Sequence, residues 1–293
     1  MYIKKLLYYC FFYIAVLLFQ GATGQLFAKH TEPPPFQRLL SPDSLLTPVY
    51  SIPVRSTCFS IDQLQNYYIA DDAGSIFKYS HVGTFQFSYN NKRLGEVGKI
   101  DASNPLSVLV YYPAFETIIL LDRTLSPIRE LNLFDFDVLE PKGVAVSNDN
   151  NIWVFDQVTA QLKKLDPYGT TLFESRNLNQ ITQKNIVPEY LLENNNLLYL
   201  SDTENGLFVF DNFGQLKEEV PIRGVGKFQI EGSQIIYFKN KQLVIYNMES
   251  FFETSIDLPS IPGSILEIDF QKKRIFIRQP EVVAVYQIKL EKD

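Results

Sequence analysis

The chain has 293 residues, of which 46% are hydrophobic and 14% aromatic, and this apolar content excludes wholesale disorder. Its formal net charge of -6 leaves no basic excess for neutralising phosphates, so no nucleic-acid partner is expected. Two cysteines exclude a disulfide scaffold, and two histidines leave little material for histidine-based metal or catalytic sites.

Residues 1–24 have the pattern of a secretory signal peptide. Lys4 and Lys5 precede the unbroken apolar run 6–19, and small residues lead to a cleavage position after Gly24. A retained anchor is the alternative, but this run of 14 residues is short of the roughly 20 that a spanning helix needs. We therefore predict an exported protein without stable membrane insertion after cleavage. It is expected in the periplasm or at the outer membrane of a Gram-negative bacterium, or as a secreted protein.

Two regions of different composition follow the predicted signal peptide. Residues 25–50 include three prolines at 33–35, which exclude a helix there, and are interpreted as an N-terminal arm. Over residues 51–293, apolar and polar residues alternate in runs of four to seven that turn residues separate. This pattern predicts short β-strands and no amphipathic helix of ten residues or more. Signal cleavage leaves Cys58 as a lone cysteine, which we interpret as a buried thiol in a strand.

A repeated feature distinguishes among all-β architectures. Six apolar runs each end in an aspartate or an amide residue, at spacings of 34 to 50 residues. The six end residues are Asp72, Asp122, Asp156, Asp202, Asn240 and Gln279. Four-stranded propeller blades have about this length, so the pattern predicts a six-bladed β-propeller of four-stranded antiparallel blades. Because amides replace the acid twice, we interpret these residues as structural blade anchors that bond backbone N–H groups, rather than as charged channel residues.

The repeats resemble known propeller sequences. Segments 141–146 and 150–156 look like the NHL repeat of six-bladed propellers, as do Asp202 and the segment 206–211 that follows it. Segment 199–202 is also similar to the YWTD signature of another six-bladed group. The resemblance covers about residues 51 to 290 and implies the fold, without specifying an activity. The chain as a whole resembles uncharacterised exported bacterial propeller proteins.

The sequence of the last expected blade indicates how the propeller closes. Three strands are expected at 265–269, 274–277 and 282–290, and the sequence ends at Asp293, so a fourth strand cannot follow them. Part of the stretch 36–52 has enough apolar residues for one edge strand. We therefore predict that this N-terminal stretch completes the sixth blade and joins the two ends of the propeller.

Few residues are candidates for a catalytic or metal-binding site. Asp135, Asp137 and Glu140 form an acidic cluster that resembles the start of a calcium loop, although a solvated loop between blades is the default interpretation. His30 lies in the arm and His81 in a hairpin turn, so neither is paired with a nucleophile in the sequence. No catalytic residue, cofactor-binding residue or metal ligand can be assigned from spacing.

The preferred function is therefore an exported, non-catalytic propeller that acts as a protein-interaction scaffold, with an envelope or secreted protein as its partner and no cofactor. One alternative is a metal-dependent lactonase-like hydrolase of the gluconolactonase type, which shares the fold and binds a divalent metal through Glu, Asn and Asp. The other alternative is a carbohydrate-binding module, since the chain contains 23 Phe and 17 Tyr residues that could contact sugar rings.

Overall fold

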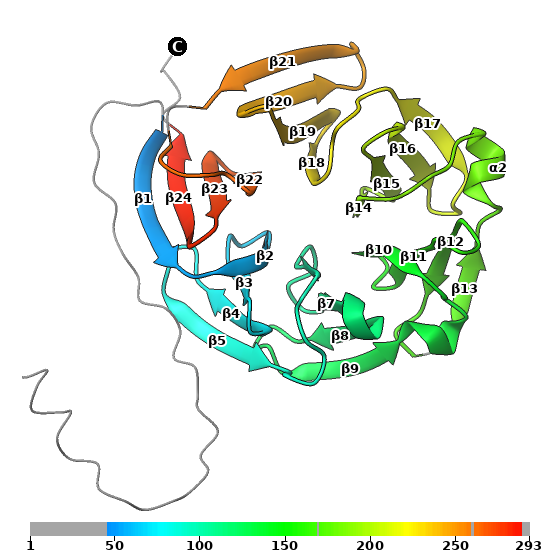
Figure 1. Cartoon of the computed structure of the whole chain (residues 1–293), viewed down its shortest axis with the longest axis horizontal. Helices are drawn as coiled ribbons and strands as arrows, with labels where there is room; N and C mark the ends of the chain where they lie inside the picture. The colour runs from blue at the N-terminus through cyan, green and yellow to red at the C-terminus, as the bar shows by residue number, and fades with distance from the viewer. Residues whose placement is uncertain (1–45, 169, 259–260, 289–293) are drawn as a thin grey trace, which may run out of the picture. The chain divides into compact units, whose positions relative to one another are not determined.

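The computed structural model describes residues 46–168, 170–258 and 261–288, and these form a six-bladed β-propeller (Figure 1). Each blade is a four-stranded antiparallel sheet, as the sequence predicted. Blades 1 to 3 consist of β2 (Ser56–Ile61), β3 (Tyr67–Asp71), β4 (Ser75–Tyr79) and β5 (Phe85–Asn90); β6 (Lys99–Asp101), β7 (Val108–Tyr112), β8 (Thr117–Leu121) and β9 (Pro127–Asn132); and β10 (Pro141–Val146), β11 (Ile152–Asp156), β12 (Gln161–Leu165) and β13 (Thr171–Glu174). Blades 4 to 6 consist of β14 (Tyr190–Asn194), β15 (Leu197–Asp202), β16 (Gly206–Asp211) and β17 (Leu216–Val220); β18 (Phe228–Glu231), β19 (Gln234–Lys239), β20 (Gln242–Asn247) and β21 (Phe252–Asp257); and β22 (Glu267–Gln271), β23 (Arg274–Gln279), β24 (Val282–Ile288) and β1 (Leu46–Pro53).

The hydrophobic core lies between neighbouring blades. The middle strands are buried on both faces, which explains why β8 and β11 are continuous apolar runs rather than alternating ones. The outermost strands face solvent, and every residue of β21 is exposed. Aromatic side chains connect the sixth and first blades, where the ring of Tyr67 packs against the ring of Phe276 at a centroid distance of 5.1 Å. The fold is thus a ring of sheets stabilised by packing from blade to blade.

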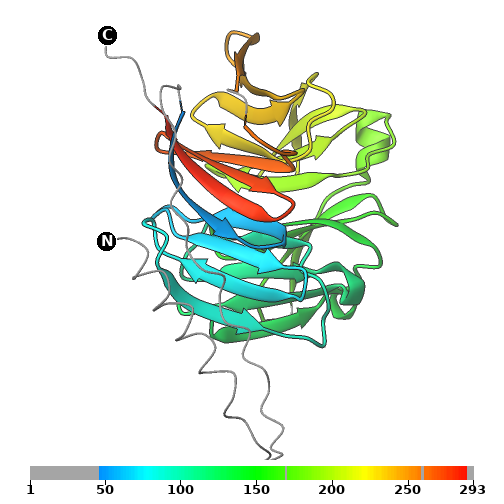
Figure 2. The ribbon, with the colours of Figure 1, turned by 60° about the vertical axis from the view of Figure 1, so that its left-hand side comes forward.

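The predicted ring closure is confirmed. Strand β1 pairs with β24, from Leu46 opposite Ile288 to Pro53 opposite Val282 (Figure 2). The register shifts between Pro48 and Tyr50, so the proline lies beside a bulge, where its missing N–H is tolerated. The closing strand therefore occupies the end of the predicted stretch 36–52. Residues 1–45 lie outside the described part of the chain. The signal peptide (1–24) and residues 25–45 of the N-terminal arm therefore stay predictions.

In blade 2, the predicted anchor residue lies at a different strand from the anchors of the other blades. Asp156 and Asp202 end the second strands of their blades, whereas Asp122 follows the third strand of blade 2. The second strand of that blade ends at Tyr112 and is followed by Pro113, so it lacks the expected acid. This shift of one strand accounts for the uneven spacings of 50 and 34 residues around position 122.

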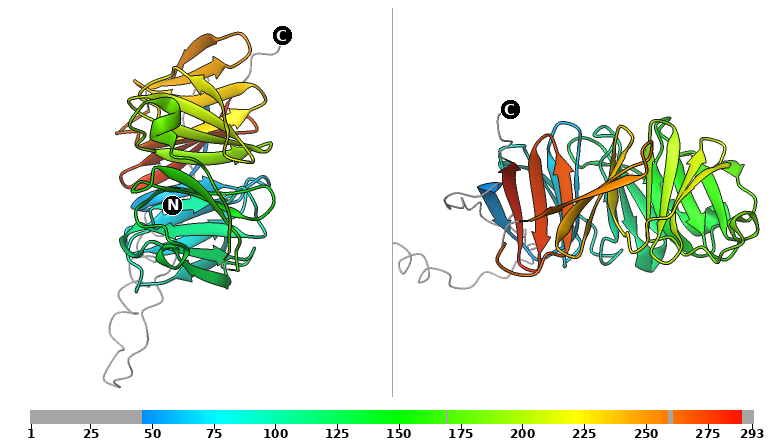
Figure 3. Two further views of the ribbon diagram at one scale, coloured as in Figure 1. Left: turned by 90° about the vertical axis from the view of Figure 1, so that its right-hand side faces the viewer. Right: turned by 90° about the horizontal axis from the view of Figure 1, so that it is seen from above.

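Strand direction defines two faces of the propeller (Figure 3). Turns after the first and third strands lie on one face, while turns after the second strand and connections between blades lie on the other, which we call the cavity face. The cavity face carries two short 3₁₀ helices, η1 (Pro113–Phe115) and η2 (Leu133–Phe136), and the helix α2 (Leu178–Thr182). No helix among the described residues is long and apolar enough to cross a membrane.

Candidate functional site

A cavity of about 450 Å³ lies on the propeller axis, at the ends of the innermost strands that reach the cavity face. Every blade contributes to its wall. One lining residue from each blade, in chain order, is Thr57, Lys99, Gly143, Tyr190, Lys227 and Glu267. Because these residues are separated by about 40 positions in sequence, only the closed ring brings them together.

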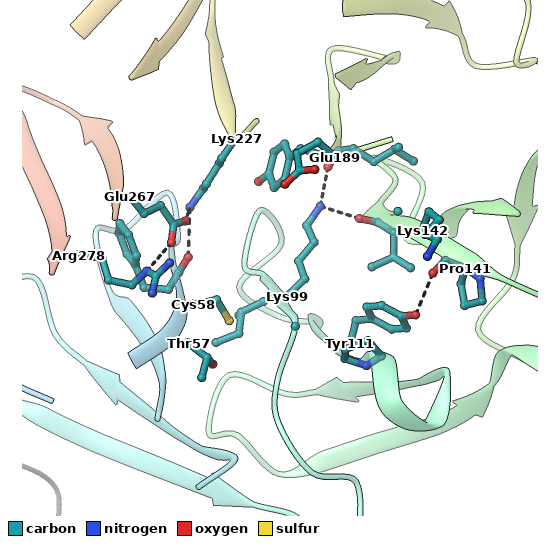
Figure 4. Close-up of a pocket in the computed structure, with 18 residues that line it drawn as sticks. Thr57, Cys58, Lys99, Tyr111, Pro141, Lys142, Glu189, Lys227, Glu267 and Arg278 are labelled. Atoms are coloured by element: carbon teal, nitrogen blue, oxygen red, sulfur yellow. Dashed lines mark hydrogen bonds and ion pairs between the residues drawn. The ribbon is translucent and has the colours of Figure 1, made fainter. Parts of the chain in front are cut away.

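Lys99 is the lysine at the start of β6, and its side chain extends towards blades 3 and 4 (Figure 4). Its Nζ donates to the carbonyl oxygens of Val144 at 2.6 Å and Leu191 at 2.5 Å. The ammonium also lies 4.1 Å from the ring centroid of Tyr190. Within the described ranges, Lys99 forms no ion pair with a carboxylate. Burial lowers its pKa from 10.5 to about 8, although Asp101 opposes this shift.

A second group of charges lies on the opposite side of the cavity (Figure 4). Lys227 pairs with Glu267 at 2.6 Å and with Asp269 at 3.3 Å, and Arg278 pairs with Glu267 at 2.8 Å. Burial disfavours the Lys227 charge, but the two carboxylates outweigh burial and hold the pKa of this lysine above its ordinary value. Burial raises the pKa of Asp269, while Lys227 opposes that rise. These four side chains therefore neutralise one another, unlike Lys99.

Cys58 also lines the cavity and is half-buried. Its Sγ lies 3.8 Å from the carbonyl oxygen of Val97. Burial raises the pKa of the thiol to about 12, and Lys227 and Arg278 oppose this shift only in part. At neutral pH the group is therefore a thiol rather than a nucleophilic thiolate.

The rim of the cavity face carries exposed apolar side chains over blades 2 to 4. We call this set the apolar arc: Phe115, Phe134, Leu139, Val158 and Val187, which are 48% to 65% exposed. Backbone hydrogen bonds join the loops that carry the arc: Leu133 N–H donates to Glu116 O at 2.9 Å, and Gln157 N–H donates to Glu140 O at 2.9 Å. The side chain of Gln157 continues this connection by donating to Ile186 O at 3.0 Å. The arc is therefore one hydrogen-bonded surface, not a scatter of unrelated residues.

Three acidic residues lie in one loop of the apolar arc. Asp135, Asp137 and Glu140 are exposed in the connection that carries Phe134 and Leu139. The Asp137 carbonyl accepts a hydrogen bond from Lys163 Nζ at 2.8 Å, and Glu140 pairs with Lys142 at 3.0 Å. No three His, Cys, Asp or Glu side chains in the described part of the chain form a group that could hold a metal ion, and this acidic cluster forms none. Because Lys142 pairs with Glu140, Asp135 and Asp137 are the acids that give this part of the arc negative charge.

Two of the six expected anchor residues support the arc directly. Asp156 is fully buried, and its carboxylate accepts hydrogen bonds from the N–H groups of Glu140 at 3.0 Å and Val158 at 3.2 Å. Asp202 accepts one from the N–H of Val187 at 2.8 Å. Both carboxylates thus fix loops that hold apolar arc residues. Extra hydrogen bonds lower the pKa of Asp202 despite its burial.

The other four anchor residues differ in their environments. Asp122 binds the N–H groups of Thr124 and Ser126 in the turn before β9. Asp72 is exposed, and the neighbouring Asp71 makes the equivalent bonds to Ala73 and Ser75, so the blade 1 assignment shifts by one residue. Asn240 is exposed in a hairpin turn with a positive φ of 52°, and Gln279 donates to Pro262 O. None of the six anchor residues lines the cavity.

Lys99 was not predicted as a site residue from the sequence. The signal was present, because a Gly-Lys pair precedes or begins the innermost strand at 98–99 and again at 226–227. His81, the one histidine among the described residues, lies in the turn before β5, where its carbonyl accepts bonds from Tyr67 and Arg274.

No family model matches the chain, and no curated protein matches it in sequence. Solved structures do match. The Pan2 WD40 domain of Neurospora crassa is 7% identical with a TM-score of 0.62, and the match covers 85% of this chain and 97% of that one. An inactive virginiamycin B lyase from Staphylococcus aureus, solved with quinupristin, is 10% identical with a TM-score of 0.59 over 87% and 99% of the two chains. BamB from Moraxella catarrhalis is 13% identical with a TM-score of 0.53, again over 87% and 99%. At these identities the likeness shows the propeller fold alone.

Proposed function

We propose that the protein is an exported, non-catalytic, NHL-like propeller of the bacterial envelope or periplasm that acts as a protein-interaction scaffold. Its partner docks on the apolar arc. The observation that carries this proposal is the continuity of the arc, whose five apolar side chains are each about half exposed or more on hydrogen-bonded loops.

Exposed apolar side chains that lie together favour burial against another molecule. Here the supporting loops are already fixed, because Asp156 and Asp202 bind their N–H groups. A preformed surface loses little conformational freedom on binding, so more of the interaction energy appears as affinity. This favours the arc as a docking surface over loops without such bonds.

The charges around the arc define the partner's chemistry. Asp135 and Asp137 give one edge of the arc negative charge, so the complementary surface has apolar side chains flanked by lysine or arginine. We propose an envelope or secreted protein with such a surface as the partner. Contacts of this kind weaken with added salt, because they include exposed charges.

A matched pair of variants tests the proposal. Phe134→Ser removes an arc residue that is 65% exposed, and Phe213→Ser removes a phenylalanine that is 67% exposed in a turn on the opposite face. A protein crosslinked to and co-purified with the wild type from the envelope is expected to bind the purified Phe213→Ser variant equally. Its affinity for Phe134→Ser should fall about tenfold or more, as for a central aromatic contact. Equal binding to both variants, with unchanged melting temperatures, would refute the assignment of the arc.

A further inference from the structure

The central cavity contains a lysine charge that the scaffold role does not use. Its wall contains Lys99 and the paired group of Lys227, Glu267 and Arg278. In that group each cation has a carboxylate partner, and Asp269 adds a further acid. Lys142, also in the wall, pairs with Glu140. Glu189 also lies in the wall, but among the described residues Lys99 is the cavity cation that forms no ion pair with a carboxylate.

The hydrogen bonds of Lys99 leave it able to bind one more acceptor. An ammonium has three donors, and Lys99 directs two of them to the carbonyl oxygens of Val144 and Leu191. These bonds and the ring of Tyr190 hold the ammonium in the cavity rather than in bulk water. A charge fixed in a partly desolvated site attracts an anion more strongly than a charge on the surface does.

The rest of the wall limits the kind of anion. Phe59, Ile100, Tyr111 and Leu191 contribute apolar surface, and the volume of about 450 Å³ suits a small organic molecule. A phosphate group favours several convergent donors, but Arg278 already uses its Nε for Glu267 and its Nη1 for Ser56 O. One available ammonium donor beside these apolar side chains matches a single carboxylate attached to an apolar body.

We propose that the cavity binds an organic monocarboxylate with an apolar body, and that Lys99 is the counter-ion of the carboxylate. This inference is independent of docking on the apolar arc. The carboxylate has two sources with the same chemistry: a free small acid, or the C-terminus of a polypeptide whose last residue is apolar. Both place one negative charge beside Lys99 and an apolar group against the aromatic wall.

In the test, the full-length protein is titrated at pH 7 with 3-phenylpropanoate and, separately, with its neutral amide. Calorimetry measures the binding of each compound. The acid is expected to bind about tenfold or more tightly than the amide, because only the acid forms a charged hydrogen bond. Lys99→Met should weaken binding of the acid by a similar factor. Lys78→Met is the matched control: Lys78 is a buried lysine that donates to Arg123 O and lies over the Tyr68 ring, but it does not line the cavity.

Two short peptides that end in phenylalanine, one with a free and one with an amidated C-terminus, distinguish the two sources. Binding of the free peptide, but not the amidated one, supports a polypeptide C-terminus. Binding of 3-phenylpropanoate without either peptide supports a free acid. If neither 3-phenylpropanoate nor the free peptide binds at 10 mM, or if Lys99→Met binds as the wild type does, the proposal is overturned.

A pH series provides a second readout if Lys99→Met folds poorly. Affinity for the acid should fall as the pH rises above about 8, the pKa of Lys99, while the weak affinity for the amide stays constant. The groups that share this environment are Asp101, Tyr190, Lys227 and Cys58, together with Glu189 in the wall. Constant affinity for the acid through pH 9.5 would overturn the proposal. Phe134→Ser should keep wild-type binding of the acid, so failure of the cavity and failure of the arc are distinguishable.

Discussion

The desolvated Lys99 should make stability depend on pH in a way that Lys99→Met abolishes. The folded chain holds this proton with a pKa of about 8, against an ordinary value of 10.5, chiefly because burial disfavours the charge. The unfolded state therefore binds more protons between these two values, and stability rises with pH in this window. Below about pH 8, Lys99 is protonated in both states, and its full unfavourable contribution to the folding free energy is present.

The magnitude follows from the two pKa values. A difference of one pKa unit corresponds to about 1.4 kcal/mol, so the protonated Lys99 disfavours folding by about 3 kcal/mol at pH 7. At pH 9.5 most of the folded protein has lost this proton, and the unfavourable contribution falls to about 1 kcal/mol. Methionine keeps the apolar stem but cannot titrate. The stability of the wild type relative to Lys99→Met should therefore rise by about 2 kcal/mol from pH 7 to pH 9.5.

Urea unfolding of both proteins at several pH values measures this change, and the fluorescence of Trp153, the single tryptophan, reports unfolding. Lys142→Met is a control for other groups that titrate, since Lys142 is exposed at the same cavity. If the stability difference between wild type and Lys99→Met changes by less than about 0.5 kcal/mol over this pH range, the reasoning is refuted, because a Lys99 pKa of about 8 in the folded protein requires a larger change.

Three further predictions concern the fold and its export. Tyr50→Ala should lower the free energy of unfolding by about 3–5 kcal/mol in urea melts, because this closing-strand residue is 1% exposed; a loss below 1 kcal/mol would contradict a cooperative seam. Trp153→Phe should cost about 1–3 kcal/mol in the same assay, because Glu193 loses the indole N–H donor at 2.5 Å; no loss would show that this bond contributes nothing. Mass spectrometry of envelope-fractionated protein should find Gln25 as the first residue; an intact Met1 would identify an anchor.

The sequence predicted the architecture well because local patterns carry it. Each blade repeats short apolar runs and turns, and the missing fourth strand of blade 6 pointed to the N-terminal stretch. The blade 2 repeat was misaligned because Tyr112 and Pro113 stand where an acid was expected, which made Asp122 the nearest match. Local pattern therefore predicted the number of blades, but not the role of each acid.

The candidate sites were harder to predict because they depend on contacts between distant segments. Lys99 is part of an ordinary blade connection in sequence, and only its contacts with Val144 and Leu191 distinguish it from a surface lysine. Phe134 and Val158 belong to different blades, and hydrogen bonds between their loops make them one surface. No spacing rule in a single repeat encodes either arrangement.

The pairing of β1 with β24 also constrains the order in which the protein forms during synthesis. Leu46 is made early, but its partner Ile288 lies near the end of the chain. At about 5–20 residues per second, the ribosome needs roughly 10–50 s to make the segment between them. During this interval β1 has apolar residues and an unpaired edge but no partner strand. The seam therefore cannot form until β24 is available, and the edge of β1 that pairs with it stays unpaired until then.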